Sequence, residues 1–415
     1  MTSRLRHSIL FALLALLCGQ SPAAGLSKPN IVLILADDLG YGDLSCYGAT
    51  KVSTPRIDRL AKEGMRFTDA HSASAVCSPT RYGILTGRYP WRHPALAYGV
   101  LAHDAPMSIG PDEPTIARLL KSAGYATACV GKWHLGWGNP KPDWNAELHP
   151  APVDAGFDYY FGMPNANTME PLVFIENRRV VGLDPSDPIR VLGNTKMEGG
   201  TAARVTHGEI DSQHVAKARA WLRQHQADAP VRPFFLYLPL VSIHAPQLAN
   251  ARFKGMNQVG IRGEFLAEHD WAVGEILDEL DRLGLREDTL VVYSSDNGGL
   301  DAGQFKPVGG CFKNYGHSMN GVLRGMKSDA WEGGHRVPMI VRWPGHTPPG
   351  AVSDALVSLN DLFVTFASVG GVELPPERPT DSKDITPVLK APGATARDFA
   401  HHASYQGIIA LREGD

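Results

Sequence analysis

The most constraining feature of the chain is the segment NIVLILA at residues 30–36, in which Asn30 is followed by an unbroken apolar run. A half-solvated strand would alternate apolar and polar residues. An uninterrupted run rich in β-branched residues instead suits a strand buried on both faces of a parallel sheet. Asp37 and Asp38 follow the run directly. We therefore expect a covered sheet with acidic side chains at the carboxyl end of this strand.

Strand-like and helix-like segments alternate along the rest of the chain. Thr54 and Pro55 are typical N-cap and first-turn residues, and they mark the start of the first helix. This alternation predicts an α/β fold, with a mostly parallel sheet sandwiched by helices and ligands bound at the carboxyl ends of its strands. Further strands are expected at residues 125–130, 233–240, 289–294 and 337–343, and helices at residues 55–64, 113–124, 211–226, 264–284 and 360–370.

The composition fits one large, enzyme-sized domain. Of 415 residues, 43% are hydrophobic and 20% are charged, so the chain can bury a large core, and we place the main domain at residues 26–395. The formal net charge is −3, and it becomes −5 when Arg4 and Arg6 are removed with an N-terminal leader. Such a chain has no general positive field to recruit nucleic acid, so anion binding must be local.

Residues 1–25 have the pattern of a secretory signal peptide. Basic residues precede an apolar run at residues 9–17, and small residues follow at positions 21–25. The run is too short to remain as a membrane span, so cleavage would release a secreted or periplasmic protein with no stable membrane span. Cys18 is preceded by leucine, which is larger than the residue that a lipoprotein signal normally has there.

Few cysteines are available for disulfides. Apart from Cys18 and Cys77, the chain contains Cys46, Cys129 and Cys311. Three cysteines allow at most one disulfide, so the fold does not rest on a disulfide framework despite the predicted export.

Oxygen-bearing side chains follow two of the predicted strands. Asp37 and Asp38 follow the first strand, and Asp296 and Asn297 follow the strand that begins near residue 289. A parallel sheet can bring them together, and a set of hard oxygens without histidine or thiolate suits Ca²⁺ or Mg²⁺. The alternative is that these residues only cap the turns after the strands, as Asp and Asn often do.

The segment CSPTR at residues 77–81, followed by GILTGR at residues 83–88, is the most specific motif. A purely structural explanation would be a cysteine and a proline in a loop before a helix that begins near Thr80. The C-x-P-x-R pattern, however, resembles the signature of type I sulfatases. In that family a maturation enzyme oxidises the cysteine to formylglycine (3-oxoalanine), so the resemblance implies this modification at Cys77.

Three further segments match the same family in sequence and in order. They are GKWHLG with Lys132 and His134, SIHAP with His244, and LRGMK with Lys327, which precedes the block WEGGHRVP. Any one of these residues alone would count as a solvated or structural side chain. Together the matches resemble a type I, formylglycine-dependent sulfatase of the arylsulfatase and glycosaminoglycan-sulfatase kind, within the alkaline phosphatase superfamily.

The resemblance implies a role for each matched residue. Cleavage of a sulfate ester places negative charge on the leaving oxygen, so a site rich in cations suits the reaction. One hydroxyl of the hydrated aldehyde would attack sulfur, a histidine would protonate the leaving group, and the second hydroxyl would expel sulfate. The implied ligands of one Ca²⁺ or Mg²⁺ ion are Asp37, Asp38, Cys77, Asp296 and Asn297. The implied catalytic residues are Cys77, Arg81, Lys132, His134, His244 and Lys327.

The expected function is hydrolysis of a small-molecule or oligosaccharide sulfate ester, either a sulfated carbohydrate or an aryl sulfate. One alternative is a phosphodiester or phosphonate monoester hydrolase on the same fold. Those enzymes typically have histidine at the position of Asn297, so the asparagine favours sulfate. A second alternative is an inactive homologue that binds sulfated glycans.

Two regions leave the interpretation open. Residues 396–415 read as a turn and the start of a strand, and by the resemblance we expect them to begin a small C-terminal subdomain that is truncated here. Trp91, Arg92, His93 and His103 follow the signature, and they either border the substrate or simply pack and pair.

Overall fold

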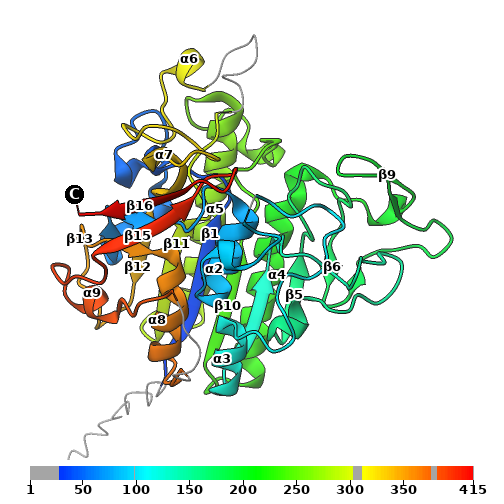
Figure 1. The fold of residues 1–415 in the computed structure, drawn as a ribbon, viewed down its shortest axis with the longest axis horizontal. Helices are drawn as coiled ribbons and strands as arrows, with labels where there is room; N and C mark the ends of the chain where they lie inside the picture. Colours follow the sequence, from blue (N-terminus) through cyan, green and yellow to red (C-terminus); the bar gives the residue numbers. More distant parts are fainter. Residues whose placement is uncertain (1–27, 98, 302–310, 375–380, 415) are drawn as a thin grey trace, which may run out of the picture.

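A computed structural model describes residues 28–97, 99–301, 311–374 and 381–414. The predicted signal peptide lies outside the described residues. Within them, ten strands form one central sheet in the order β13-β2-β12-β11-β1-β10-β4-β5-β6-β7 (Figure 1). These strands are β1 (Asn30–Ala36), β2 (Met65–Phe67), β4 (Ala126–Val130), β5 (Tyr159–Gly162), β6 (Ile175–Glu176), β7 (Arg179–Val180), β10 (Phe234–Pro239), β11 (Thr289–Ser295), β12 (Met339–Arg342) and β13 (Ala351–Ser353).

The centre of the sheet is parallel, as predicted. Strand β1 lies between β10 and β11 and is parallel to both, with Ala36 opposite Ser295 at the carboxyl end. Strands β4 and β5 continue the parallel order beyond β10. Strand β12, in contrast, is antiparallel to β11 and β2, and β6 and β7 are antiparallel at the other edge. The sequence pattern did not predict these antiparallel edges.

Helices cover both faces of the sheet (Figure 1). Every residue of β1 is buried, and its side chains alternate between two cores. Leu33 lies in the core that includes residues of α2, α3 and α8, whereas Ile34 lies in the core that includes residues of α1, α4 and α5. The helices are α1 (Pro55–Glu63), α2 (Cys77–Thr86), α3 (Ile116–Ser122), α4 (Ile210–Asp228), α5 (Gly260–Arg282), α6 (Cys311–Tyr315), α7 (Glu332–His335), α8 (Leu362–Val369) and α9 (Thr386–Lys390).

One helix differs from its prediction in a way that affects the functional site. Helix α2 begins at Cys77, not near Thr80, and all of its residues are buried. Pro79 is tolerated because amide groups in the first turn of a helix need no intrahelical acceptor. The early start places Cys77 at the N-terminal end of α2.

The remaining strands form three small two-stranded sheets. The C-terminal pair is an antiparallel hairpin beside α7 (Figure 1), and its residue Ala403 bridges to Ser74, three residues before Cys77. The hairpin includes the strand predicted near residue 407. These strands are β3 (Ala70–His71), β8 (Arg190–Val191), β9 (Met197–Glu198), β14 (Val357–Ser358), β15 (Phe399–Ala403) and β16 (Ile409–Glu413).

Two further findings concern the cysteines and membrane spans. Cys46, Cys77, Cys129 and Cys311 are free thiols, so the described residues contain no disulfide. In the same part of the chain, no helix has the length and apolar character needed to cross a bilayer.

Candidate active site

Four oxygen-bearing side chains meet at the carboxyl ends of β1 and β11. Asp37 and Asp38 follow β1, and Asp296 and Asn297 follow β11, so the pairing of these two strands brings them together. All four are at most 2% exposed. Asp37 Oδ1 and Asn297 Oδ1 are buried and have no hydrogen-bond partner among the described residues.

Three cations pair with the three carboxylates of this cluster. Lys132 Nζ lies 2.5 Å from Asp37 Oδ2, and Lys327 Nζ lies 2.7 Å from Asp38 Oδ1. Arg81, on α2, donates to Asp296 Oδ2 through Nε at 3.0 Å and through Nη2 at 2.7 Å. The site therefore carries three positive and three negative formal charges within the protein.

The pairing sets the ionisation of the carboxyl groups. Burial acts to raise the pKa of Asp37, but Lys132 and other nearby cations outweigh it and hold this pKa far below its usual range. Burial likewise opposes ionisation of Asp38, and Lys327 lowers its pKa overall. Burial and the charge of Asp37 raise the pKa of Asp296 to about 6. The carboxylate form of Asp296 is thus less favoured than in water, although Arg81 pairs with it.

Unpartnered buried oxygens indicate that this cluster fits a metal ion. A buried oxygen without a donor costs free energy, and a bound cation would satisfy it. Asp37, Asp38, Asp296 and Asn297 offer only hard oxygen ligands, which Ca²⁺ and Mg²⁺ prefer. The donor set therefore fits one such ion.

Cys77 lies beside this cluster. Its Sγ and carboxylate oxygens of Asp37 and Asp296 all lie within 4.8 Å of one another. The side chain is 2% exposed, and burial raises the pKa of its thiol despite the nearby Lys132. An unmodified cysteine here is a poor thiolate nucleophile, because reactive cysteines have a lowered pKa and some access to solvent.

His134 follows β4 in a left-handed backbone conformation, with φ of 56°. Its amide donates to Pro164 O at 3.0 Å, and its Nε2 donates to Leu101 O at 3.3 Å. Burial, followed by the charge of Lys132, lowers the pKa of His134 well below its usual value. The ring is therefore neutral, and its buried Nδ1 has no partner in the described part of the chain.

His244 approaches the cluster from the segment after β10. Its Nδ1 donates to Ala245 O at 2.6 Å, which leaves Nε2 at 3.8 Å from Asp38 Oδ2. Burial lowers the pKa of His244, although Asp38 acts to raise it. The structure thus brings together all the residues for which the sequence predicted a catalytic or metal-binding role.

Sequence reasoning missed the residues that support the turn after β1. Asp43 is fully buried, and its carboxylate accepts hydrogen bonds from Arg262 Nε at 3.1 Å and from His317 Nε2 at 2.8 Å. Asp43 also accepts from the amide of Gly40 at 2.8 Å, and Arg262 Nη2 donates to the carbonyl of Asp38 at 3.4 Å. The helix predicted at residues 264–284 begins earlier in the structure, at Gly260, so Arg262 lies in its first turn. A charged residue on the buried side of a helix could have signalled this support, but the predicted range did not include Arg262.

Four residues after the signature had two possible roles, contact with the substrate or packing and pairing within the protein. In the structure each of them has a partner within the protein. Trp91 stacks on Tyr89 with ring centroids 4.4 Å apart, and Arg92 Nη2 lies 2.6 Å from Asp381 Oδ1. Both line a groove of about 450 Å³ that none of the predicted catalytic residues lines. The other two also have partners: His93 packs against Tyr82, and His103 bonds Asn194.

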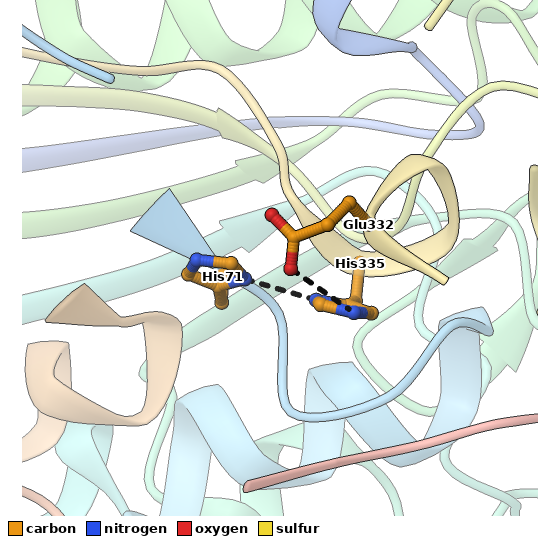
Figure 2. A group of neighbouring side chains, drawn as sticks. All are labelled: His71, Glu332 and His335. Atoms are coloured by element: carbon orange, nitrogen blue, oxygen red, sulfur yellow. Dashed lines mark hydrogen bonds and ion pairs between the residues drawn. The ribbon is translucent and has the colours of Figure 1, made fainter. Parts of the chain in front are cut away.

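A second group of potential metal ligands lies outside this site. Figure 2 shows Glu332 and the rings of His71 and His335 turned toward one another. The two Nδ1 atoms are 2.9 Å apart while the ring centroids are 5.1 Å apart, so the nitrogens face each other along the line between the rings. Two ligands of one metal would instead have lone pairs that converge on a point. A hydrogen bond joins His71 to His335, and His402 of the C-terminal hairpin stacks on His335 with ring centroids 3.3 Å apart, so this group contacts the hairpin.

Comparison with known proteins identifies the family. The sulfatase family model matches residues 29–372. An N-acetylgalactosamine-6-O-sulfatase of Bacteroides thetaiotaomicron is 38% identical, over 93% of this chain and 81% of that protein. Arylsulfatase A of Homo sapiens is 35% identical, over 94% of this chain and 75% of that protein.

A solved structure agrees with these matches. It was described under the metabolism of multiple glycosaminoglycans by Bacteroides thetaiotaomicron, and it superposes with a TM-score of 0.87 at 36% identity, over 93% of this chain and 86% of that one. The fold, the family model and the relatives agree. The chain belongs to the sulfatase family, with its alkaline-phosphatase-like fold, and is a hydrolase of sulfate esters.

Proposed function

We propose that this sulfatase is an exported enzyme that uses formylglycine at position 77 and one divalent cation to release inorganic sulfate from a sulfated carbohydrate. The observation that carries the proposal is the environment of Cys77. It is the first residue of α2, lies next to Asp37 and Asp296, and has a raised thiol pKa. A thiol in this position is badly suited to act as a thiolate, whereas an oxidised residue there would be surrounded by charged groups.

Charge balance supports a divalent cation. The three ion pairs around Asp37, Asp38 and Asp296 cancel, so the protein alone offers no net positive charge to a sulfate ester. A bound Ca²⁺ or Mg²⁺ ion would polarise a sulfate oxygen and add the missing positive charge. Asn297 would complete the ligand set through its unpartnered Oδ1.

The cationic side chains would stabilise the charge that develops in the reaction. The hydrated aldehyde at position 77, when formed, supplies one hydroxyl to attack sulfur and a second to expel sulfate. Lys132 and Lys327 lie in separate loops, and Arg81 lies one helical turn after Cys77. Prearranged charges of this kind typically contribute about 10²–10³ each in rate.

The two histidines leave different ring nitrogens without a backbone hydrogen bond, Nδ1 in His134 and Nε2 in His244. His134 is neutral and keeps Nδ1 free of partners in the described chain, so Nδ1 can accept the proton of the second hydroxyl. His244 directs Nε2 toward the cluster, where this atom can carry a proton to the leaving oxygen. We assign the role of base to His134 and that of acid to His244.

The relatives suggest the first substrate to test. The bacterial relative at 38% identity and a relative from Canis lupus familiaris at 36% identity are named for sulfate at the 6-position of N-acetylgalactosamine. We propose the same class of substrate for this chain. Residues 1–25 would direct export, and residues 26–395 would form the catalytic domain, to which the hairpin within residues 396–415 adds.

The decisive experiment combines two readouts on protein coexpressed with a formylglycine-generating enzyme. Mass spectrometry of the peptide across Cys77 should show loss of the thiol and gain of the aldehyde, and the same protein should release sulfate from N-acetylgalactosamine 6-sulfate. Cys77→Ala, which cannot be converted, is the matched control.

Each outcome bears on a separate part of the proposal. Conversion without sulfate release from any sugar or aryl sulfate would refute the assigned activity. Equal sulfate release by Cys77→Ala would refute the formylglycine mechanism. Higher catalytic efficiency toward an aryl phosphodiester than toward the matched aryl sulfate would favour the phosphodiesterase alternative.

A further inference from the structure

Tyr405 lies in the turn of the C-terminal hairpin, between β15 and β16. It is 45% exposed although it is a large aromatic residue. Its backbone amide donates to Ser328 O at 3.0 Å, and Ser328 directly follows Lys327. The amide of Ser328 in turn donates to Ala75 O at 2.9 Å, two residues before Cys77. The turn is therefore bonded to the loops that carry two proposed catalytic residues.

The ring of Tyr405 contacts a third loop of the site. A Cβ atom built on Gly99 would lie 3.0 Å from Tyr405 Cε2, so the ring rests on the glycine, whose φ is +131°. Two residues later, Leu101 accepts the hydrogen bond from His134 Nε2, and its own amide donates to Ser78 Oγ. The aromatic ring thus lies between the loop of Lys327 and the loop that supports His134.

Backbone strain at the same place supports a functional arrangement. Ser328 has φ of 82°, which is uncommon for a residue with a side chain, and such residues concentrate at functional sites. A glycine at position 99 and a left-handed Ser328 together allow the turn of the hairpin to approach both loops closely. This approach places an exposed aromatic ring against Gly99, in the loop whose Leu101 carbonyl accepts the hydrogen bond from His134.

We propose that Tyr405 is a specificity-determining residue that packs against the sugar ring of the sulfate ester. An aromatic ring offers a rigid apolar surface, and the apolar face of a pyranose is complementary to it. The inference rests on the proposed function, because it names the part of the substrate that the site recognises. Tyr405 would take no part in the chemistry at sulfur.

Substitution at position 405 tests the assignment. Tyr405→Ala should raise KM for N-acetylgalactosamine 6-sulfate about tenfold with kcat changed less than about twofold, as expected for the loss of one aromatic contact. Tyr405→Phe should behave like the parent, because the ring and not the hydroxyl makes the contact. Gly99→Ala should also raise KM, because its methyl group would displace the ring.

Phe399→Ala is the matched control, since Phe399 is equally exposed at 45% but lies at the far end of the same hairpin. Its KM should stay at the parent value. If the parent enzyme releases sulfate and Tyr405→Ala keeps its KM, the assignment of Tyr405 is wrong while the proposed function stands. If the parent releases no sulfate, the proposed function fails first, and the assignment falls with it.

Discussion

Asp43→Asn tests whether one buried ion pair holds the turn that carries the candidate metal ligands. Asp43 is fully buried, and Arg262, which pairs with it, is 3% exposed. The carboxylate also accepts from His317 Nε2 at 2.8 Å and from the amide of Gly40 at 2.8 Å. An amide has nearly the same volume, but it is uncharged, and its NH₂ group would face one of these donors.

The expected effect on stability is large for a single side chain. Removing one partner of a buried ion pair costs about 3–5 kcal/mol, because the other charge stays buried without compensation. With an unfolding entropy of about 2.1 cal/mol/K per residue, this loss lowers Tm by about 3–6 °C in a chain of this length. Arg262 also donates to the carbonyl of Asp38, so cation affinity should fall about 10- to 100-fold, as is usual for residues that orient metal ligands.

Thermal unfolding and calorimetric titration with Ca²⁺ measure the two effects on the same protein. Asp184→Asn is the control, because this exposed carboxylate accepts hydrogen bonds from Ser186 within its own turn. Its Tm should change by less than about 1 °C, the usual result for a surface substitution. Equal Tm and equal Ca²⁺ affinity in Asp43→Asn and Asp184→Asn would refute the reasoning.

Three further results are expected. Cys77→Ser should stop after at most one turnover and leave a sulfated serine, detectable by mass spectrometry, because serine has no second hydroxyl; steady turnover would contradict this. Asn297→Ala should stay folded but bind Ca²⁺ about tenfold more weakly or worse, and unchanged affinity in a calorimetric titration would remove it from the ligand set. Burial acts to raise the pKa of Glu279, but Arg223 and neighbouring arginines lower it to about 2. A carboxyl group whose pKa is lower in the folded state stabilises the fold at pH values above its unfolded-state pKa. Because the partner arginines are partly exposed and screened by solvent, Glu279→Gln should cost only about 1–2 kcal/mol at pH 7 by chemical denaturation. This difference should shrink as pH falls from about 4.5 toward 2.

The sequence predicted the centre of the fold and the meeting of Asp37, Asp38, Asp296 and Asn297 at one edge of the sheet. The segment NIVLILA could be interpreted without tertiary information, because a strand buried on both faces carries a nearly continuous run of apolar residues in place of an alternating pattern. The partnership of Asp37 with Asp296 followed from one general rule, that the carboxyl ends of parallel strands lie at the same edge of the sheet.

Other features depend on contacts that no local pattern encodes. The start of α2 is fixed by Thr80, whose hydroxyl donates to Ser74 O, while the sequence CSPT by itself resembles a loop. Arg92 and Asp381 form an ion pair although they are far apart in the sequence, so the residues around either one do not predict the pair. The antiparallel direction of β12 likewise follows from the path of the chain after β11 and not from its apolar residues.

The pairing between the segment before Cys77 and the C-terminal hairpin has a consequence for the order of events during synthesis. Ala75 and Ala73 exchange backbone hydrogen bonds with Ala403, and Cys77 is 2% exposed in the folded protein. A ribosome completes residue 77 long before residue 403. Under the proposed conversion of Cys77, a maturation enzyme that binds the signature as an extended peptide would therefore reach it only before the later part of the chain has folded. Once the fold is complete, Cys77 is buried and the signature is no longer accessible as an extended peptide.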